Sequence, residues 1–140
     1  MKYKNMLKTA AALTLILSVG CGAKDPVTEE EKKSESEVQV ISVEEAKNMM
    51  EEQEVIIVDV RTRAEFEEAH IEGAILLTLD TIPNQAEEII PDKTATYLLY
   101  CRSGNRSNQA ANLLVDMGYE KIYDFGGIID WTYGTVSGAE

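Results

Sequence analysis

The chain has 140 residues, of which 44% are hydrophobic and 27% are charged, and its formal net charge is −12 at pH 7. This length indicates a single domain, and the strong acidity argues against nucleic-acid binding and against electrostatic attachment to an anionic membrane. One histidine and two cysteines do not make a metal-ligand set, so no metal site is expected.

Residues 1–20 have the features of a secretory signal and not of a folded domain. Three positive charges come first, on Lys2, Lys4 and Lys8. An apolar run follows at residues 10–19, which is too short to span a bilayer comfortably. Small residues directly before Cys21 resemble a bacterial lipoprotein signal, in which the cysteine is lipidated and becomes the new N-terminus. The alternative is an ordinary signal cleaved near Gly20, which would leave a free thiol.

Residues 21–37 are predicted to be a lipidated cysteine followed by an acidic, flexible tether. The segment after Cys21 has no hydrophobic period, contains Pro26 and is rich in Glu, Lys and Ser. As a flexible coil it would reach about 20–25 Å. Removing the signal with its three lysines would change the net charge from −12 to −15. We therefore expect residues 38–140 to be an exported domain, anchored by lipid on the extracytoplasmic side of a bacterial cell membrane.

From residue 38 onward, the pattern changes to alternating strands and helices. A short strand is predicted at residues 38–41. Ser42 with Glu45 then forms a capping box, the signature of a helix start. The apolar face of this helix comprises Val43, Ala46, Met49 and Met50. Residues 55–58 are an apolar, β-branched run, which is typical of a strand covered on both faces.

The same alternation continues through the middle of the domain. Thr62 with Glu65 is a second capping box and begins a short helix that runs through residues 66–69. Residues 74–77 are predicted to form another short strand. A further helix is stopped by Pro91, which cannot continue it. The apolar positions of that helix are Ile82, Ala86, Ile89 and Ile90.

The last predicted elements surround the second cysteine. Residues 97–100 form a buried strand, and residues 108–117 form a helix that ends at Gly118. A last strand is predicted at residues 122–125, and residues 127–131 begin a final helix. This alternation favours an α/β fold with a central, mostly parallel five-stranded sheet and helices on both faces. About 100 residues are enough for one modest core.

Cys101 is the only cysteine of this domain, and it lies where a predicted strand turns into a helix. The carboxyl ends of strands in open α/β sheets are where ligands bind. Inward-pointing turn amides, the helix start and the charges of Arg102 and Arg106 would lower the pKa of the thiol. Gly104 would permit the turn. The sequence therefore predicts a reactive cysteine, and the alternative is a small apolar residue beside two solvated arginines.

The four arginines of the chain fall in two short stretches. Asp59 and Arg61 follow a predicted strand, so we expect them at the same edge of the sheet as the cysteine. There they could guide an anionic substrate, or they could form a structural ion pair and turn. Arg63 is expected to be a solvated charge on the next helix. Arg102 and Arg106 could focus an anion despite the acidity of the chain.

The loop around the second cysteine resembles the active-site loop of the rhodanese family of sulfurtransferases. Its residues are Cys101, Arg102, Ser103, Gly104, Asn105, Arg106 and Ser107. Three further stretches fit the same family in order and spacing. They are Asp59-Val60-Arg61 with Glu65-Phe66, His70-Ile71-Glu72-Gly73-Ala74, and Gly126-Gly127 followed by Trp131. Together the four stretches cover residues 38–131, which would be most of one rhodanese-like domain.

The resemblance implies sulfur transfer through a persulfide on Cys101. A donor such as thiosulfate would supply the sulfur, and cyanide, a small thiol or a reduced thioredoxin-like protein would accept it. Cys101 and Arg106 would be catalytic, and Asp59 and Arg61 would support the site. Substrate binding would fall to Arg102, Ser103, Gly104, Asn105 and Ser107. The resemblance implies no cofactor and no metal.

Other residues in these stretches are expected to have structural roles. His70 is the only histidine and could pair with the cysteine as in a protease. The rhodanese family uses this motif at a turn before a strand, so we expect a hydrogen-bonded turn histidine instead. Gly126 and Gly127 are expected to allow a close backbone approach beside the active loop. Trp131 and Tyr133 are expected to pack on the core.

Two other functions are kept as alternatives. Cysteine-dependent phosphatases and arsenate reductases need five residues between the cysteine and the arginine, so that the loop wraps a tetrahedral anion. Here Arg106 follows Cys101 after four residues, and the next position is Ser107. The second alternative is a rhodanese-like module that binds sulfur or docks a partner without turnover, although such modules commonly lack the loop cysteine.

Overall fold

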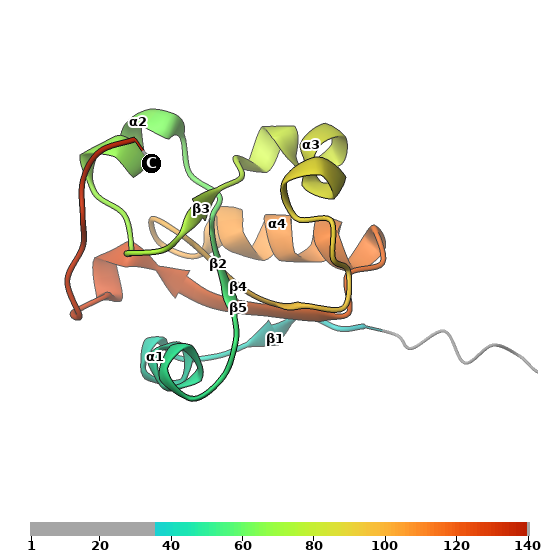
Figure 1. Ribbon diagram of the computed structural model, residues 1–140, viewed down its shortest axis with the longest axis horizontal. Helices are drawn as coiled ribbons and strands as arrows, with labels where there is room; N and C mark the ends of the chain where they lie inside the picture. Colours follow the sequence, from blue (N-terminus) through green and yellow to red (C-terminus); the bar gives the residue numbers. More distant parts are fainter. Residues whose placement is uncertain (1–35, 140) are drawn as a thin grey trace, which may run out of the picture. The chain divides into compact units, whose positions relative to one another are not determined.

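Five parallel strands form the central sheet of the domain (Figure 1). The computed structural model describes residues 36–139, and within them the strands lie in the order β1-β5-β4-β2-β3. Their bounds are Gln39–Val40 (β1), Ile56–Asp59 (β2), Ile75–Leu76 (β3), Thr96–Cys101 (β4) and Lys121–Gly127 (β5). The predicted α/β fold with a five-stranded sheet is therefore confirmed, and every strand pair is parallel.

Helices cover both faces of this sheet. They are α1 (Val43–Glu52), α2 (Arg63–Glu68), α3 (Ile82–Ile89) and α4 (Asn105–Asp116). In Figure 1, α1 lies below the sheet, and α3 and α4 lie above it. Two buried clusters correspond to these faces, one with Ala46 of α1 and the other with Leu114 of α4. Phe66 of α2 is only 2% exposed and belongs to the α1 side.

Both predicted capping boxes are present. The Ser42 hydroxyl accepts from the Glu45 amide at 3.1 Å, and the Glu45 carboxylate accepts from the Ser42 amide at 2.8 Å. Thr62 and Glu65 form the corresponding bonds at 3.3 and 3.0 Å. Each box satisfies amides that a helix start otherwise leaves unpaired. Because the partners are three residues apart, local sequence alone determines where α1 and α2 begin.

Two predicted helices differ from the structure. α4 begins at Asn105, earlier than the predicted residues 108–117, because Gly104 adopts a φ of +104° and turns the chain directly from β4 into the helix. The predicted helix at residues 127–131 is wrong. β5 extends through the first of these residues, and only the short 3-10 turn Ile128–Asp130 (η2) follows it.

The chain beyond η2 runs to α2 and attaches to its carboxyl end. His70 and Val136 exchange two backbone hydrogen bonds, at 2.8 and 2.9 Å. The Gly138 amide also donates to the Glu67 carbonyl at 2.9 Å. Figure 1 shows this red segment rising to end beside α2. The short helix α2 is therefore held by a segment that lies far from it in the sequence.

The predicted signal peptide, lipidation site and most of the tether lie outside the described residues. These predictions concern residues 1–20, Cys21 and residues 21–37. Of these residues, the structure describes only 36 and 37. Among the helices of residues 36–139, none has both the length and the apolar character needed to cross a membrane. The predictions about export and anchoring stay predictions.

Gly126 and Gly127 bring β5 against the loop that follows β4, as predicted. A Cβ atom on Gly127 would lie 2.3 Å from the Arg102 carbonyl oxygen and 2.7 Å from the Ser103 Cα. A Cβ on Gly104 would in turn lie 3.4 Å from the Cα of Gly126. Backbone atoms, which cannot rotate away, therefore occupy the space that a side chain at position 127 would need.

Replacing Gly127 with alanine should displace the loop at Arg102 and Ser103. We expect a loss of about 1–3 kcal/mol in the free energy of unfolding, as for other overpacked sites, together with shifted amide resonances for both loop residues. Urea denaturation and amide NMR spectra measure the two effects. Gly73→Ala is the control, since nothing lies within 4 Å of its Cβ and a φ of +81° is its only penalty. Loop amides that stay in place in Gly127→Ala would contradict the close approach.

Candidate active site

The cysteine loop lies at the carboxyl edge of the sheet, where a parallel α/β fold places its ligand sites. Cys101 is the last residue of β4, which lies between β2 and β5. The chain turns at Gly104 and enters α4 at Asn105. The turn after β2 reaches the same edge, because the Val60 amide donates to the Tyr100 carbonyl at 3.1 Å. Three segments of the chain therefore meet around the thiol.

The sulfur of Cys101 is enclosed by hydrogen-bond donors. The Gly104 amide donates to Sγ at 3.0 Å, and the cysteine is only 1% exposed. Burial by itself would raise the pKa of the thiol, but hydrogen bonds outweigh it and lower the pKa of Cys101 below its usual value. The groups that lower it are the amide and hydroxyl of Ser107 and the amides of Gly104 and Ser103. The loop therefore stabilises the thiolate form relative to that of an ordinary cysteine.

The backbone donors named here refine the prediction from the sequence, which relied partly on arginine charge. Ser107 is fully buried, and its hydroxyl lies 3.1 Å from the Gly104 carbonyl and 3.3 Å from the Gly126 carbonyl. It therefore ties the loop to both the helix start and the end of β5. Asn105 points elsewhere, since its side-chain oxygen accepts from Gln109 at 2.7 Å on the exposed side of α4.

The two loop arginines have different surroundings. Arg102 and Ser103 are exposed, and the Arg102 side chain forms no ion pair with any residue in 36–139. Arg106 forms a bidentate pair with Glu65, with Nη1–Oε2 and Nη2–Oε1 distances of 2.8 Å each. The Arg106 hydrogen bonds are the largest cause that holds the pKa of Glu65 well below its usual value. The sequence placed Glu65 in a helix cap and in one of the stretches that fit the family, but it did not predict the pair with Arg106, which lies 41 residues away.

Asp59 and Arg61 form a buried ion pair rather than an open binding site. The Arg61 Nη2 lies 2.7 Å from Asp59 Oδ2, and Asp59 and Arg61 are 0% and 5% exposed. The Arg61 amide donates to Asp59 Oδ1 at 2.9 Å, which closes the turn. Arg61 Nη2 also donates to the Ala69 carbonyl at 2.6 Å. The structural alternative for this pair, an ion pair and turn, is therefore present.

The other residues noted in the sequence have the structural roles expected of them. His70 is buried, with Nδ1 2.7 Å from the Phe66 carbonyl and its ring stacked 3.7 Å from the Phe66 ring. Trp131 packs 5.9 Å from Phe125 and 5.0 Å from Tyr133, measured between ring centroids. The Arg63 side chain is 72% exposed. The predictions of a turn histidine, a packed tryptophan and a solvated arginine are confirmed.

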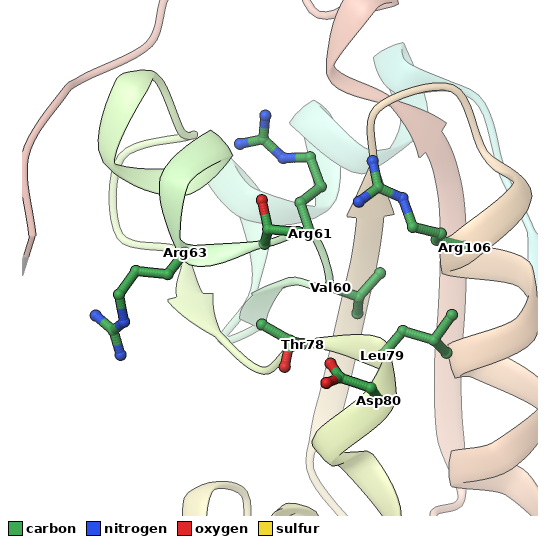
Figure 2. A pocket seen from close by; sticks show the side chains of 8 residues that line it. Val60, Arg61, Arg63, Thr78, Leu79, Asp80 and Arg106 are labelled. Atoms are coloured by element: carbon green, nitrogen blue, oxygen red, sulfur yellow. The ribbon is translucent and has the colours of Figure 1, made fainter.

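A cavity of about 550 Å³ lies beside the loop (Figure 2). Three segments surround it, namely the turn after β2, the segment after β3 and the start of α4. Its lining residues are Val60, Arg61, Thr62, Arg63, Thr78, Leu79, Asp80 and Arg106. In Figure 2, Arg106 extends from α4 along one wall, whereas Arg63 points outward at the opposite side. Three of the four arginines of this acidic chain therefore line one cavity at the edge of the sheet.

Known proteins are similar to this chain in sequence and in fold. Residues 42–133 match the family described as the Rhodanese-like domain. The thiosulfate sulfurtransferase GlpE of Tolumonas auensis is 36% identical over 94 residues, which are 66% of this chain and 87% of that protein. The thiosulfate sulfurtransferase PspE of Escherichia coli is 33% identical over 81 residues, which are 58% of this chain and 78% of that protein.

Solved structures agree with the sequence matches. A rhodanese with anions from Escherichia coli superposes with a TM-score of 0.57 at 32% identity, covering 61% of this chain and all of that chain. A rhodanese-like domain protein from Staphylococcus aureus superposes with a TM-score of 0.62 at 30% identity, covering 72% of this chain and 99% of that chain. Because the family match spans residues 42–133, which include strands β2 to β5, the cysteine loop and the two glycines of β5, this chain belongs to the rhodanese family.

Proposed function

We propose that this protein is a sulfurtransferase that moves a sulfane sulfur from a small anionic donor to a thiophilic acceptor through a persulfide on Cys101. The observation that carries the proposal is the hydrogen bond that the Gly104 amide donates to Sγ of the buried Cys101, in a loop that lowers the pKa of this thiol. Only a thiolate attacks a sulfane sulfur efficiently. Membership of the rhodanese family and the names of its sulfurtransferase relatives support the same reaction.

In the first step, the Cys101 thiolate attacks the outer sulfur of thiosulfate. A bond forms between Sγ and that sulfur, the sulfur–sulfur bond of the donor breaks, and its electron pair leaves with sulfite. The exposed Arg102 supplies a cation for the approaching dianion. The same amides that hold the thiolate would hold the outer sulfur of the persulfide, which also carries negative charge. The nearly complete burial of Cys101 favours donors that are no larger than a small inorganic anion.

In the second step, a nucleophile attacks the outer sulfur of the persulfide. With cyanide the products are thiocyanate and the original thiolate, so that no oxidant or reductant is consumed. A small thiol or a reduced thioredoxin-like protein would accept the same sulfur in a cell. The two steps need no cofactor, because the loop itself stabilises the anionic sulfur in each of them.

The loop geometry is less suited to phosphatase or arsenate chemistry. Those reactions need a free arginine at the end of the loop to hold a tetrahedral anion. Arg106 comes one residue too early for that spacing, and Glu65 already occupies both ends of its guanidinium group. A docking module without turnover is the remaining alternative, and the sulfur-loading experiment below distinguishes it from an enzyme.

We also propose that the domain is anchored by lipid on the extracytoplasmic side of the membrane, by the lipoprotein-type signal and Cys21. An unpaired thiol in an exported protein is a liability unless it has a use, and persulfide chemistry would supply that use for Cys101. A flexible tether of acidic residues would keep the catalytic domain just off the membrane surface.

Cys101→Ser should abolish turnover, because a hydroxyl at this position cannot carry the persulfide. The full chain is incubated with thiosulfate and then with cyanide, and intact mass is read after each step. We expect the wild type to gain one sulfur atom and to lose it as thiocyanate forms. Activity that persists in Cys101→Ser would remove the persulfide mechanism, and a wild type that gains no sulfur would favour the docking module.

The thiolate of Cys101 should persist to lower pH in the folded protein than in the unfolded chain, because folding lowers the pKa of this thiol. Ultraviolet absorbance of the thiolate is titrated in buffer and in urea, and the Cys101→Ser signal is subtracted to remove any contribution from Cys21. The rate of sulfur loading should follow the same curve, falling as the pH drops below the pKa of the folded state. A midpoint no lower than that of the unfolded chain would contradict the predicted activation.

Cys21→Ser should prevent lipid attachment, because a serine offers no thiol to modify. The full chain is expressed in a bacterial host with a labelled fatty acid, and label and membrane association are measured. We expect both for the wild type and for Cys101→Ser, and neither for Cys21→Ser. Label that is absent from the wild type would support the ordinary cleaved signal instead.

A further inference from the structure

The carboxylate of Glu65 bonds simultaneously to α2 and to the cysteine loop. Its Oε2 accepts from the Thr62 amide at 3.0 Å, from the Thr62 hydroxyl at 2.8 Å and from Arg106 Nη1 at 2.8 Å. Its Oε1 accepts from Arg106 Nη2, also at 2.8 Å. One side chain therefore closes the start of α2 and fixes the first turn of α4.

We propose that Glu65 is a positioning residue of the sulfur-transfer site. Its pair with Arg106 is a clamp between α2 and the cysteine loop, so that Arg106 does not bind the donor anion. This inference rests on the proposed sulfur transfer for its meaning. It differs from the role that the family resemblance suggested for Arg106, a direct part in catalysis.

The guanidinium group of Arg106 is already engaged by Glu65. Both of its Nη atoms bond to Glu65 in the parallel geometry that arginine and carboxylate prefer, and the two side chains are only 31% and 28% exposed. A donor anion would have to displace a bidentate carboxylate to reach this charge. Arg102 carries a charge at the same loop without any ion pair in the described part of the chain, so an anion meets that charge first.

Arg106 also lies in the turn that holds the sulfur. It stands between Gly104, whose amide donates to Sγ at 3.0 Å, and Ser107, whose hydroxyl bonds to the Gly104 carbonyl at 3.1 Å. A shift of the backbone at Arg106 would therefore move both of these neighbours, because all three belong to the same turn. The orientation of the sulfur's hydrogen-bond donors therefore depends on where Arg106 is held.

The helix α2, which carries Glu65, is itself held by several contacts. Phe66, the residue after Glu65, is buried, and the Ala69 carbonyl accepts from the buried Arg61 at 2.6 Å. The Glu67 carbonyl also accepts from Gly138. α2 is thus fixed on several sides. Since the paired guanidinium holds the pKa of Glu65 far below its usual value, the clamp stays charged at any pH near neutrality.

Glu65→Gln in the full chain distinguishes a clamp from a donor-binding role for Arg106, because the two roles predict changes of opposite sign. Glutamine keeps the shape and can still complete the capping box, but it loses the ionic bidentate pair. If the pair is a clamp, the variant breaks it, so the loop loosens and the pKa of the Cys101 thiol rises. We then expect kcat/KM for thiosulfate to fall roughly tenfold, which is within the range of interaction energies between contacting residues. If Arg106 binds the donor, the variant frees its charge, so KM and the thiol pKa both fall.

Arg106→Gln and the double variant Glu65→Gln/Arg106→Gln complete the cycle. A clamp predicts that either single change costs about the same and that the double change costs no more than one, since both break the same pair. Arg106→Lys should recover only part of the loss, because a point charge cannot reproduce two parallel bonds. An Arg106→Gln loss much larger than that of Glu65→Gln would assign Arg106 a contact with the donor and overturn the proposal.

Two controls lie on the same helix. Glu67→Gln removes a carboxylate whose one ion pair within residues 36–139 is a loose contact, 3.8 Å from the exposed Arg63. It should change neither the thiol pKa nor kcat/KM for thiosulfate. Thr62→Ala removes the capping hydroxyl but leaves the pair of Glu65 with Arg106, so it should lower the unfolding temperature without changing the thiol pKa. A thiol pKa that rises equally in Thr62→Ala would show that loss of helix stability is sufficient and would overturn the clamp.

The thiol titration and the sulfur-loading assay separate this inference from the proposed function. Wild-type protein that gains no sulfur from thiosulfate would remove the sulfurtransferase proposal, whereas the thiol titration needs no turnover and still tests the clamp. A raised thiol pKa in Glu65→Gln supports the clamp in either case. An unchanged or lowered pKa overturns it, even if the enzyme proves to be active.

Discussion

The arrangement of donors around one sulfur atom is the constraint on which the rest of the site depends. β4 ends at Cys101, and the positive φ of Gly104 turns the chain at once into α4, so that the Gly104 amide donates to Sγ and the Ser107 hydroxyl holds the Gly104 carbonyl. A buried thiolate is unfavourable unless such bonds replace its hydration. The loop must therefore keep its geometry closely, and the neighbouring segments serve that requirement.

Each neighbour holds the loop by a different interaction. Gly127 brings β5 close enough that no side chain fits between it and Arg102. Glu65 holds Arg106 from α2, and the Asp59–Arg61 pair fixes the turn that leads into α2. Three of the four arginines are thus paired with carboxylates inside a strongly acidic chain, Arg61 and Arg106 closely and the exposed Arg63 loosely. Arg102 forms no ion pair within residues 36–139, and this makes its charge the distinctive electrostatic feature of the loop.

Much of the fold followed from local patterns. Capping boxes at Ser42 and Thr62 predicted two helix starts correctly, because their partners are three residues away. Apolar runs predicted all five strands to within a few residues. The failures occurred at the ends of elements. α4 starts earlier than expected because a glycine replaces the usual side-chain cap, and the final predicted helix is absent because β5 uses its first residue.

The sequence by itself determined the α/β class, the helix caps and the position of Cys101 between a strand and a helix, since all of these depend on neighbouring residues. Only the tertiary structure decided which groups surround that cysteine. Glu65 reaches Arg106 across 41 residues, and Val136 pairs with the backbone of His70. Neither contact has a local signal, because its two partners lie far apart in the sequence. Tertiary packing therefore determines whether each loop arginine is free to bind an anion.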